Sequence, residues 1–258
     1  MKLDTSELLY RKAIELIPGG SQMYNKRPVV YEPARYPIFA ERSEGAHLHD
    51  VDGNTYIDYL LAYGAIHLGY NYAPVMNAVI DQIRIGTIHS VNDPLEITLA
   101  EELVETIPSA EMARFFLSGS EATSAAVRIA KAHTGRNKIV KWGYHGWHEW
   151  TRMVKGGPSA GMADYLDMIH CPVESIGSVP DEVSRNTIEL RYNSIESLAD
   201  ILKADGNDIA CIIMEPLYFE LPEKGFLEEV KTLAFDCGCV LVFDEVKTGM
   251  RVSPGGAQ

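Results

Sequence analysis

The stretch IACIIMEPLYFELPEKGFLEEVKTLAFDCGCVLVFDEV (209–246) decides the fold. It begins and nearly ends with short apolar runs, IACIIM (209–214) and VLVF (240–243), which have the length and composition of buried β-strands. Between them, the spacing of apolar residues predicts a helix over 226–236. A tight turn between two strands makes them antiparallel, whereas a helix between them carries the chain back to the start of the sheet and lets the strands run parallel. The stretch therefore predicts an α/β protein.

The same alternation extends back to about residue 70. Further apolar runs predict strands at ARFFL (113–117), KIV (138–140) and TIELRY (187–192). Helical patterns surround these runs, and they cover residues 74–85, 94–107, 121–134 and 194–204. We expect a mostly parallel sheet flanked by helices, within a large domain that covers residues 70–258.

Residues 1–69 have a different pattern and are expected to form a separate N-terminal segment. Asp4 precedes an amphipathic helical pattern that Pro18-Gly19-Gly20 ends. Three prolines within residues 21–45 predict an irregular arm. Asp52-Gly53, which lies between two alternating segments, predicts a β-hairpin turn.

The pattern Asp50-x-Asp52-x-Asn54 also resembles the start of a calcium-binding loop. Such a loop needs Gly at its sixth position and Glu at its twelfth. Thr55 and Leu61 occupy these positions here. The hairpin is therefore the favoured interpretation.

The charge of the chain argues against two classes of partner. There are 23 Lys and Arg residues against 36 Asp and Glu, a formal net charge of −13 at pH 7. Such a surface repels nucleic-acid phosphates and anionic lipids. No apolar run approaches the roughly 20 residues of a membrane-spanning helix, and Asp4 and Glu7 interrupt the place of an export signal. We expect a cytoplasmic protein that binds neither nucleic acid nor membrane.

The four cysteines predict free thiols. Cys171, Cys211, Cys237 and Cys239 are too few and too scattered for a disulfide scaffold. The Cys237-Gly-Cys239 spacing differs from that of a CxxC redox pair, and no second pair of ligands suggests zinc. Buried thiols in a reducing compartment agree with the cytoplasmic expectation.

Residues able to bind a ligand follow four of the predicted strands. In parallel sheets, ligands bind outside the carboxyl ends of the strands. The segments found there are Ser118-Gly119-Ser120, Tyr144-His145-Gly146, Glu215-Pro216 and Asp244-Glu245-Val246. We expect them to meet at one edge of the sheet.

Each of these segments also has a purely structural interpretation. Ser118 could cap the following helix, and the aromatic loop could be a small hydrophobic cluster. The spacing His145-x-x-His148-Glu149 suggests a metal, but it matches none of the usual zinc helices, and we expect no metal site. Asp244 could be a cap too, although a carboxylate beside a strongly apolar strand is costly unless a cation or hydrogen-bond donors meet it.

Together the segments indicate one ligand. The start of the helix offers amides and hydroxyls to a phosphate, Tyr144 offers a ring for stacking, and Asp244 offers a carboxylate to a protonated nitrogen. Pyridoxal 5′-phosphate (PLP) has all three groups. A carboxylate that keeps the pyridine nitrogen protonated makes this cofactor an electron sink for the substrate's α-carbon.

Six runs of the sequence resemble one known family in their order and spacing. They are IPGGS (17–21), HDVDGNTYIDY (49–59), SGSEATSAAVRIAKAHTGR (118–136), YHGWHE (144–149), EP (215–216) and VFDEVKTGMRVSPGGAQ (242–258). The chain resembles the class III, fold-type-I aminotransferases, particularly the glutamate-1-semialdehyde 2,1-aminomutases and their transaminase relatives. The resemblance implies a PLP-binding large domain, a dimer, and transfer of an amino group between an amine or amino acid and a carbonyl compound.

The resemblance also implies the polar contacts to the cofactor. Ser118, Gly119 and Ser120 match the turn that binds the phosphate. Asp244 matches the partner of the pyridine nitrogen. Glu215 matches an acid that lies near the ring hydroxyl and organises the site.

Three further residues match positions around the cofactor ring. Tyr144 matches the aromatic residue that stacks on one face, and Val246 matches the residue that packs on the other. His145 follows the stacking residue and is expected to support its loop.

The chain departs from the family pattern at the catalytic lysine. In the family, the Schiff-base lysine lies further downstream than Gln258, as do the remaining strands and the C-terminal small domain. Lys247 lies only three residues after Asp244, too close to the partner of the pyridine nitrogen to reach the cofactor aldehyde. We therefore expect no catalytic residue within 1–258, no activity from this chain alone, and poor stability.

Two alternatives to an active enzyme remain open from the sequence. The chain could be a catalytically dead remnant or pseudo-subunit that acts as a binding or assembly partner. A nucleotide-binding domain is disfavoured, because SGSEA is neither a GxGxxG motif nor a P-loop. The substrate also stays open, with Tyr24 and Arg27 as possible contacts near its entrance.

Overall fold

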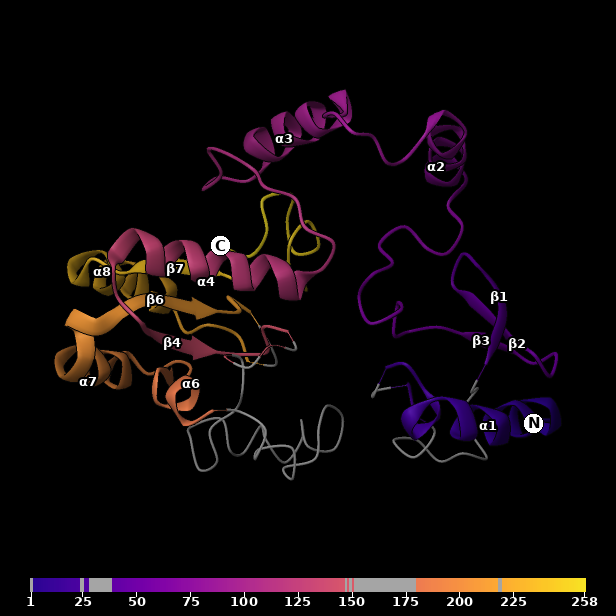
Figure 1. Ribbon diagram of the computed structural model, residues 1–258, viewed down its shortest axis with the longest axis horizontal. Helices are drawn as coiled ribbons and strands as arrows, with labels where there is room; N and C mark the ends of the chain where they lie inside the picture. Colours follow the sequence, from indigo (N-terminus) through magenta and orange to yellow (C-terminus); the bar gives the residue numbers. More distant parts are fainter. Residues whose placement is uncertain are drawn as a thin grey trace. The chain divides into compact units, whose positions relative to one another are not determined.

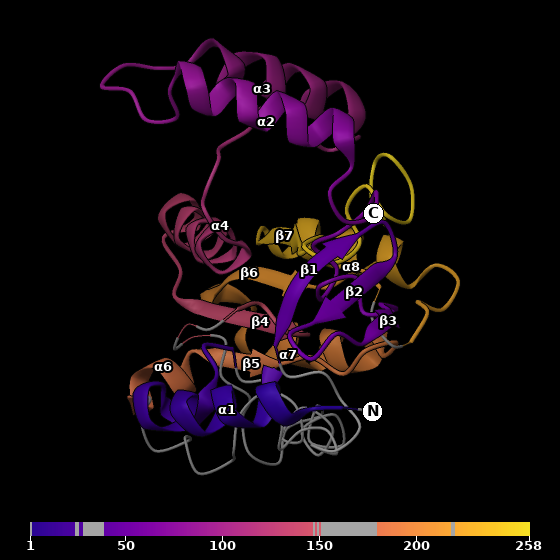
Figure 2. The same cartoon turned by 90° about the vertical axis from the view of Figure 1, so that its right-hand side faces the viewer.

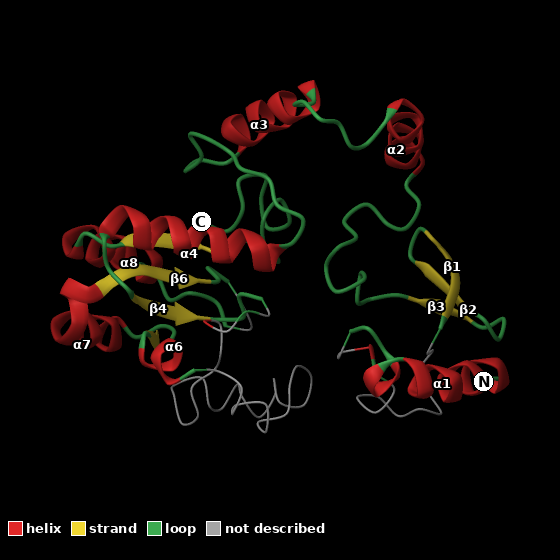
Figure 3. Ribbon diagram, viewed as in Figure 1, coloured by secondary structure: helices red, strands yellow, loops and turns green. Residues whose placement is uncertain are grey.

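The computed structural model describes residues 2–23, 26–27, 39–146, 148, 150, 180–217 and 220–258 (Figure 1). These residues divide into two compact units, one up to Asp93 and the other from Pro94 onward. Figure 3 shows the helices and strands of each unit. The N-terminal segment expected over 1–69 lies within the first unit, and the large domain expected from residue 70 stays a prediction.

The first unit combines helices with a small antiparallel sheet of strand order β1-β2-β3. Its described elements are α1 (Asp4–Leu16), the 3₁₀ helix η1 (Pro18–Gly20), β1 (Ala40–Glu44), β2 (His47–Asp50), β3 (Thr55–Ile57) and α2 (Ala73–Ile85). The hairpin between β2 and β3 is confirmed, and Gly53 at its turn has φ +84°, which glycine adopts without strain. The irregular arm expected over 21–45 is wrong at 40–44, because β1 pairs with β2 although its polar sequence shows no alternation.

The aspartates of the hairpin bind the protein's own donors. Asp52 accepts the backbone N–H groups of Thr5 (2.6 Å) and Ser6 (3.0 Å) at the start of α1. Asp50 accepts bonds from Asn54 and from the Tyr56 hydroxyl (2.8 Å). These contacts give the acidic pattern a structural role, in agreement with the hairpin interpretation.

The second unit contains a parallel sheet of strand order β5-β4-β6-β7. Its described strands are β4 (Lys138–Trp142), β5 (Thr187–Glu189), β6 (Ile209–Met214) and β7 (Val240–Phe243), and its described helices are α3 (Pro94–Thr106), α4 (Gly119–Thr134), α6 (Asp181–Arg185), α7 (Ile195–Asp205), η6 (Gly206–Asp208) and α8 (Phe226–Cys237). The expected α/β fold is confirmed.

Helices cover both faces of this sheet, as Figures 1 and 2 show for α4 and α7. Val127 and Ala130 of α4 pack on Ile139, Cys211 and Ile213. On the other face, α7 and α8 contribute Leu198, Phe226, Val230 and Ala234, which pack on Val140, Trp142, Ile212 and Met214. Every residue of β6 is buried, because this strand has a neighbouring strand on each side and helices on both faces.

Two of the strand predictions are wrong: one predicted strand is absent, and another is shorter than expected. Residues 113–117 form no strand, and Leu117 is 98% exposed. A strand needs a hydrogen-bonding neighbour, and within the described residues none pairs with this segment or with the outer edge of β7. The strand expected over 187–192 ends at Glu189, because Asn193 soon turns the chain with φ +54°.

Cys211 and Cys239 are buried free thiols, as expected, and Cys237 is a partly buried one. Cys171 lies outside the described residues. Among the described helices, none has the length and apolar character needed to cross a lipid bilayer.

Candidate active site

The predicted ligand-binding segments meet at the carboxyl edge of the parallel sheet. β4, β6 and β7 end at Trp142, Met214 and Phe243, and the segments containing Tyr144, Glu215 and Asp244 follow directly. The edge continues through backbone bonds from Glu215 N to the Trp142 carbonyl (3.2 Å) and from Asp244 N to the Met214 carbonyl (2.8 Å). These bonds hold the two carboxylates in register with the strands before them.

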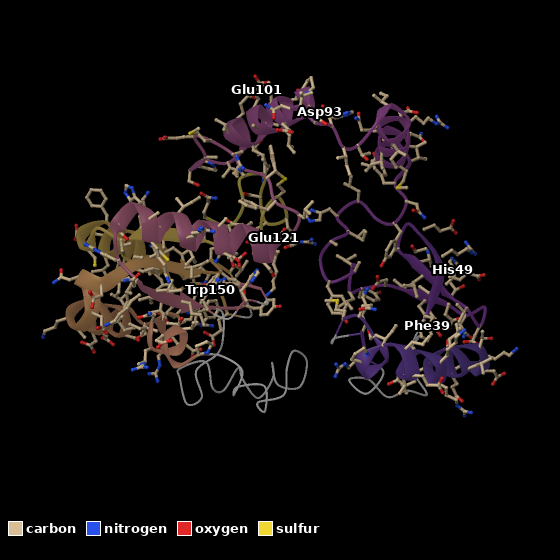
Figure 4. All side chains as sticks on the ribbon, viewed as in Figure 1. Phe39, His49, Asp93, Glu101, Glu121 and Trp150 are labelled. Atoms are coloured by element: carbon tan, nitrogen blue, oxygen red, sulfur yellow. The ribbon has the colours of Figure 1, made fainter. Side chains whose placement is uncertain are left out.

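The start of α4 has the geometry of a capped helix. The Ser118 hydroxyl accepts the Glu121 N–H (3.2 Å), and the Glu121 carboxylate accepts the Leu117 N–H (3.0 Å). Figure 4 labels Glu121 in this first turn. The capping interpretation of Ser118 is therefore correct for its hydroxyl. The N-terminus of a helix still favours an anion through its dipole, by about 0.3–2 kcal/mol.

Close contacts bring the start of α4 against the two other predicted segments. A Cβ atom at Gly119 would lie 2.7 Å from Val246 Cγ2, so the small residue is needed there. A Cβ atom at Gly146 would overlap the Ser120 hydroxyl. Thr123, which the sequence did not single out, donates its hydroxyl to the His145 carbonyl (2.7 Å). The start of α4, the aromatic loop and the Asp244 segment thus lie together.

Asp244 and His145 form a buried pair. Asp244 Oδ2 lies 2.8 Å from His145 Nδ1, and the side chains are 3% and 0% exposed. His145 Nε2 lies 3.0 Å from the Trp142 carbonyl, which can only accept a hydrogen bond, so Nε2 carries a proton. The other oxygen, Asp244 Oδ1, accepts the Val246 N–H (3.1 Å). The sequence predicted a supporting role for His145 in its loop; the contact between His145 and Asp244 was not predicted.

Glu215 is a second buried carboxylate, and it joins three segments. Its Oε1 accepts the Tyr144 N–H (2.7 Å), and its Oε2 pairs with Lys247 Nζ (2.9 Å). Gly143 allows this approach, because it has φ +105° and a Cβ atom there would lie 2.8 Å from Glu215 Oε1. Burial raises the pKa of Glu215, although Lys247 and the Tyr144 N–H oppose that effect.

Tyr144 and Val246 are close in sequence to the buried residues His145 and Asp244, but their own side chains are exposed to solvent. Tyr144 is 37% exposed and Val246 is 66% exposed, so both present apolar surface. Lys247 Nζ lies 5.9 Å from the centre of the Tyr144 ring. Its ion pair with Glu215 gives Lys247 a structural role, and our expectation that it is not the Schiff-base lysine stays a prediction.

The metal alternative gains no support from the described residues. They contain no group of three His, Cys, Asp or Glu side chains arranged to hold a metal ion. Glu149 and Tyr24 lie outside the described residues. Trp150, labelled in Figure 4, donates its indole N–H to Ser124 of α4 (2.9 Å).

The donors and acceptors at this edge fit a phosphorylated pyridine ring. The start of α4 suits the phosphate. The buried carboxylate of Asp244, in contact with His145, suits a protonated ring nitrogen. The partly exposed side chains of Tyr144 and Val246 suit a flat ring. These features define the class as α/β proteins whose sheet edge suits such a ring.

Comparisons with known proteins agree with that class. The profile of the family described as Aminotransferase class-III matches residues 30–256. The chain therefore belongs to the class III aminotransferase family.

Individual relatives include both aminotransferases and aminomutases. The chain is 39% identical to the 3-aminobutyryl-CoA aminotransferase of Cloacimonas acidaminovorans, over 100% of this chain and 59% of that protein. It is 41% identical to the glutamate-1-semialdehyde 2,1-aminomutase of Methanothermobacter thermautotrophicus, over 98% of this chain and 58% of that protein. Thus it spans less than two thirds of the curated relatives it matches.

Solved structures show the same fold. An omega-transaminase from Sphaerobacter thermophilus superposes with a TM-score of 0.83 at 30% identity, covering 98% of this chain and 57% of the other. A transaminase with PLP bound gives 0.82 at 28% identity, covering 100% and 58%.

Proposed function

We propose that this chain provides the cofactor-binding part of a PLP-dependent aminotransferase or aminomutase. The observation that carries the proposal is the meeting of three segments at one sheet edge. They are the start of α4, the Tyr144 loop, and Asp244 with its partner His145. The names of the relatives, which include aminotransferases and aminomutases, support both forms of amino-group transfer.

Each part of the site would contribute a distinct interaction. Ser118, Gly119 and Ser120 at the start of α4 bind the phosphate through amide groups and the helix dipole. Tyr144 and Val246 fix the plane of the ring. Bound PLP supplies an electron sink that stabilises negative charge at the substrate's α-carbon.

The buried acids control charge and orientation. Asp244 holds a proton on the pyridine nitrogen, and His145 keeps the Asp244 carboxylate aimed at it. Glu215 holds the Tyr144 backbone, and with it the stacking ring, in place. The substrates would be an amine or amino acid and a carbonyl compound.

The test is a titration of the chain with PLP, followed by cofactor absorbance. The variant Asp244→Asn keeps the shape of the side chain and removes its charge. We expect its dissociation constant for PLP to rise about 10- to 100-fold, because a hydrogen bond to a charged group contributes about 1.5–3 kcal/mol.

Asp200→Asn is the matched control, since Asp200 is an exposed residue of α7. It should bind PLP as the wild type does. Pyridoxal without its phosphate should bind more weakly than PLP to the wild-type chain. Equal binding of PLP by Asp244→Asn and the wild type would contradict the proposed site.

The proposal includes a homodimer in the cytoplasm. Its support is the apolar surface of α2, where Val75, Val79 and Ile83 are exposed in the described structure. Contiguous apolar surface of this kind favours association. The free thiols Cys211 and Cys239 agree with a reducing compartment.

A second candidate function is a pseudo-subunit that acts as an assembly partner. It is favoured by Phe115, Phe116 and Leu117, which are exposed in a segment outside the helices and strands. A chain that forms a stable complex with a complete relative, but binds no PLP in the titration above, would support this candidate over the enzyme.

A further inference from the structure

One buried hydroxyl group joins two of the segments that meet in the candidate active site. Thr123, near the start of α4, is 5% exposed. Its Oγ1 lies 2.7 Å from the His145 carbonyl oxygen and 3.1 Å from the Ser120 carbonyl oxygen. A hydroxyl has a single proton to donate, so the shorter contact is the main hydrogen bond. That bond leaves the helix and reaches the loop that follows β4.

The bond made by Thr123 differs from the usual bond of a threonine inside a helix. Such a hydroxyl commonly bonds back to a carbonyl about four residues earlier in the same helix. Thr134, near the end of α4, donates in this way to the Ala130 carbonyl (2.8 Å). Thr232 of α8 does the same with the Glu228 carbonyl (2.9 Å). Thr123 instead makes its shorter bond with a residue 22 positions away, so it acts between elements.

The loop also packs against the start of α4 beside this hydrogen bond. Gly146 has φ +106°, and a Cβ atom there would lie 2.8 Å from Ser120 Cα. The loop backbone therefore approaches the helix more closely than a larger residue would allow. Packing limits how near the two segments come, but it has little directional preference. The hydrogen bond from Thr123 adds direction, because its strength depends on the angle at the donor.

On its other side, the same loop is fixed to the sheet. His145 Nδ1 lies 2.8 Å from Asp244 Oδ2, and Glu215 Oε1 accepts the Tyr144 N–H (2.7 Å). These contacts orient the loop relative to the ends of β6 and β7. Thr123 supplies the corresponding contact to α4. The hydroxyl of Thr123 thus links the helix to a loop that the sheet already holds.

The two segments that Thr123 joins would bind opposite ends of one cofactor. In the proposed function, the start of α4 binds the phosphate and Tyr144 stacks on the ring. PLP is a small molecule with few rotatable bonds between these two groups. Both groups can therefore be bound at once only when the two segments keep a fixed spacing. A spacing that is set before binding raises affinity, because less freedom is lost when the ligand binds.

We propose that Thr123 is a positioning residue, whose hydroxyl fixes the start of α4 relative to the Tyr144–His145 loop so that one cofactor contacts both. This inference rests on the proposed function for the roles of the two segments. The effect of the hydroxyl on the loop can be measured without any cofactor.

The first test compares PLP with pyridoxal, which lacks the phosphate, in titrations of the chain 1–258. Thr123→Val keeps the approximate shape of the side chain and removes the hydroxyl. We expect the dissociation constant for PLP to rise about tenfold, because the His145 carbonyl loses this donor. The constant for pyridoxal should change by less than about threefold, since this ligand does not need the spacing. A general loss of folded protein would affect both ligands alike.

Three further variants complete this test. Thr123→Ser keeps the hydroxyl and should retain the preference for PLP. Thr134→Val is the matched control, since its hydroxyl bonds within the same helix, and it should bind both ligands as the wild type does. Thr123→Ala replaces Thr123→Val if that variant fails to fold, because it removes the hydroxyl without placing a methyl group against the His145 carbonyl. An unchanged ratio of the two constants without the hydroxyl, or an equal change in Thr134→Val, would overturn the inference.

Hydrogen exchange without cofactor separates this inference from the proposed function. In Thr123→Val, the Tyr144 amide should exchange about 5- to 20-fold faster, because the loop opens more often. The amide of Ile212, in the buried strand β6, reports opening of the whole sheet and should change less. Thr123→Ser should behave as the wild type does.

The two measurements together give distinct outcomes. If the wild type binds no PLP but exchange at Tyr144 rises selectively in Thr123→Val, the proposed function fails and the link made by Thr123 stands. If the wild type binds PLP, and neither the exchange nor the ligand ratio changes in this variant, only the role of Thr123 fails.

Discussion

Strand β6 and residues 113–117 are apolar runs of similar length, but they differ in burial and in secondary structure. Every residue of IACIIM (209–214) is buried, between two strands and beneath helices on both faces. In ARFFL (113–117), Phe115, Phe116 and Leu117 are exposed, and the segment forms no strand. The difference shows that an apolar run supplies the capacity for a strand, while neighbouring strands decide whether one forms.

The largest expected difference between the two runs is in stability. Ile213→Ala in β6 should lower the free energy of unfolding by about 2–5 kcal/mol, because the side chain is fully buried between β6 and α4. Leu117→Ala should change it by less than about 0.5 kcal/mol. Urea unfolding followed by circular dichroism measures both. Similar losses would mean that residues 113–117 are packed in solution.

A smaller effect is expected in the hairpin of the first unit, which tests whether polar contacts replace apolar burial there. Burial opposes ionisation of Asp50, but hydrogen bonds from Asn54 and Tyr56 lower its pKa overall. Because the folded pKa lies below the unfolded value, near 3.9, this stabilisation is present above that value and is lost as the pH falls through the folded pKa.

Tyr56→Phe should therefore weaken the hairpin by about 1–2 kcal/mol at neutral pH, and less in acid. Hydrogen exchange of the hairpin amides at several pH values measures this loss. Tyr59→Phe is the matched control, since Tyr59 is 87% exposed. Equal effects of the two variants at every pH would refute the role of the Asp50 network.

The smallest effect on stability is expected from a substitution on α2. Like Phe115, Phe116 and Leu117, the apolar residues Val75, Val79 and Ile83 of this helix are exposed. Val79→Gln should change the free energy of unfolding by less than about 0.5 kcal/mol. If α2 forms the dimer contact, the same variant should weaken dimerisation roughly tenfold, since it removes buried apolar area at the interface. Sedimentation equilibrium measures the association, and Asn77→Gln on the same helix is the control. A wild-type chain that stays monomeric would refute the proposed homodimer.

The comparison also explains which parts of the fold the sequence predicts. The bounds of β6 and β7 agree with their apolar runs, since both strands pack apolar residues against the clusters on the two faces of the sheet. β1 was missed because its polar residues are placed by pairing with β2. Residues 113–117 were misassigned for the same reason, since hydrogen-bond partners come from distant parts of the chain.

The same limit applies to the candidate site. The positions of Tyr144 and Asp244 follow from a local rule, because each comes directly after a strand. The bond between His145 and Asp244 joins residues 99 apart, and only the register of the sheet brings them together. Lys141 lies beyond the strand predicted over 138–140, and its ion pair with Glu189 depends on the neighbouring strand β5.

The strand order β5-β4-β6-β7 has a consequence for synthesis on the ribosome. β4 leaves the exit tunnel first, and β5 then adds to one of its sides and β6 to the other. β7 joins β6 last. Each new strand therefore finds its neighbour already present in the nascent chain, so this sheet can grow outward from β4 during translation.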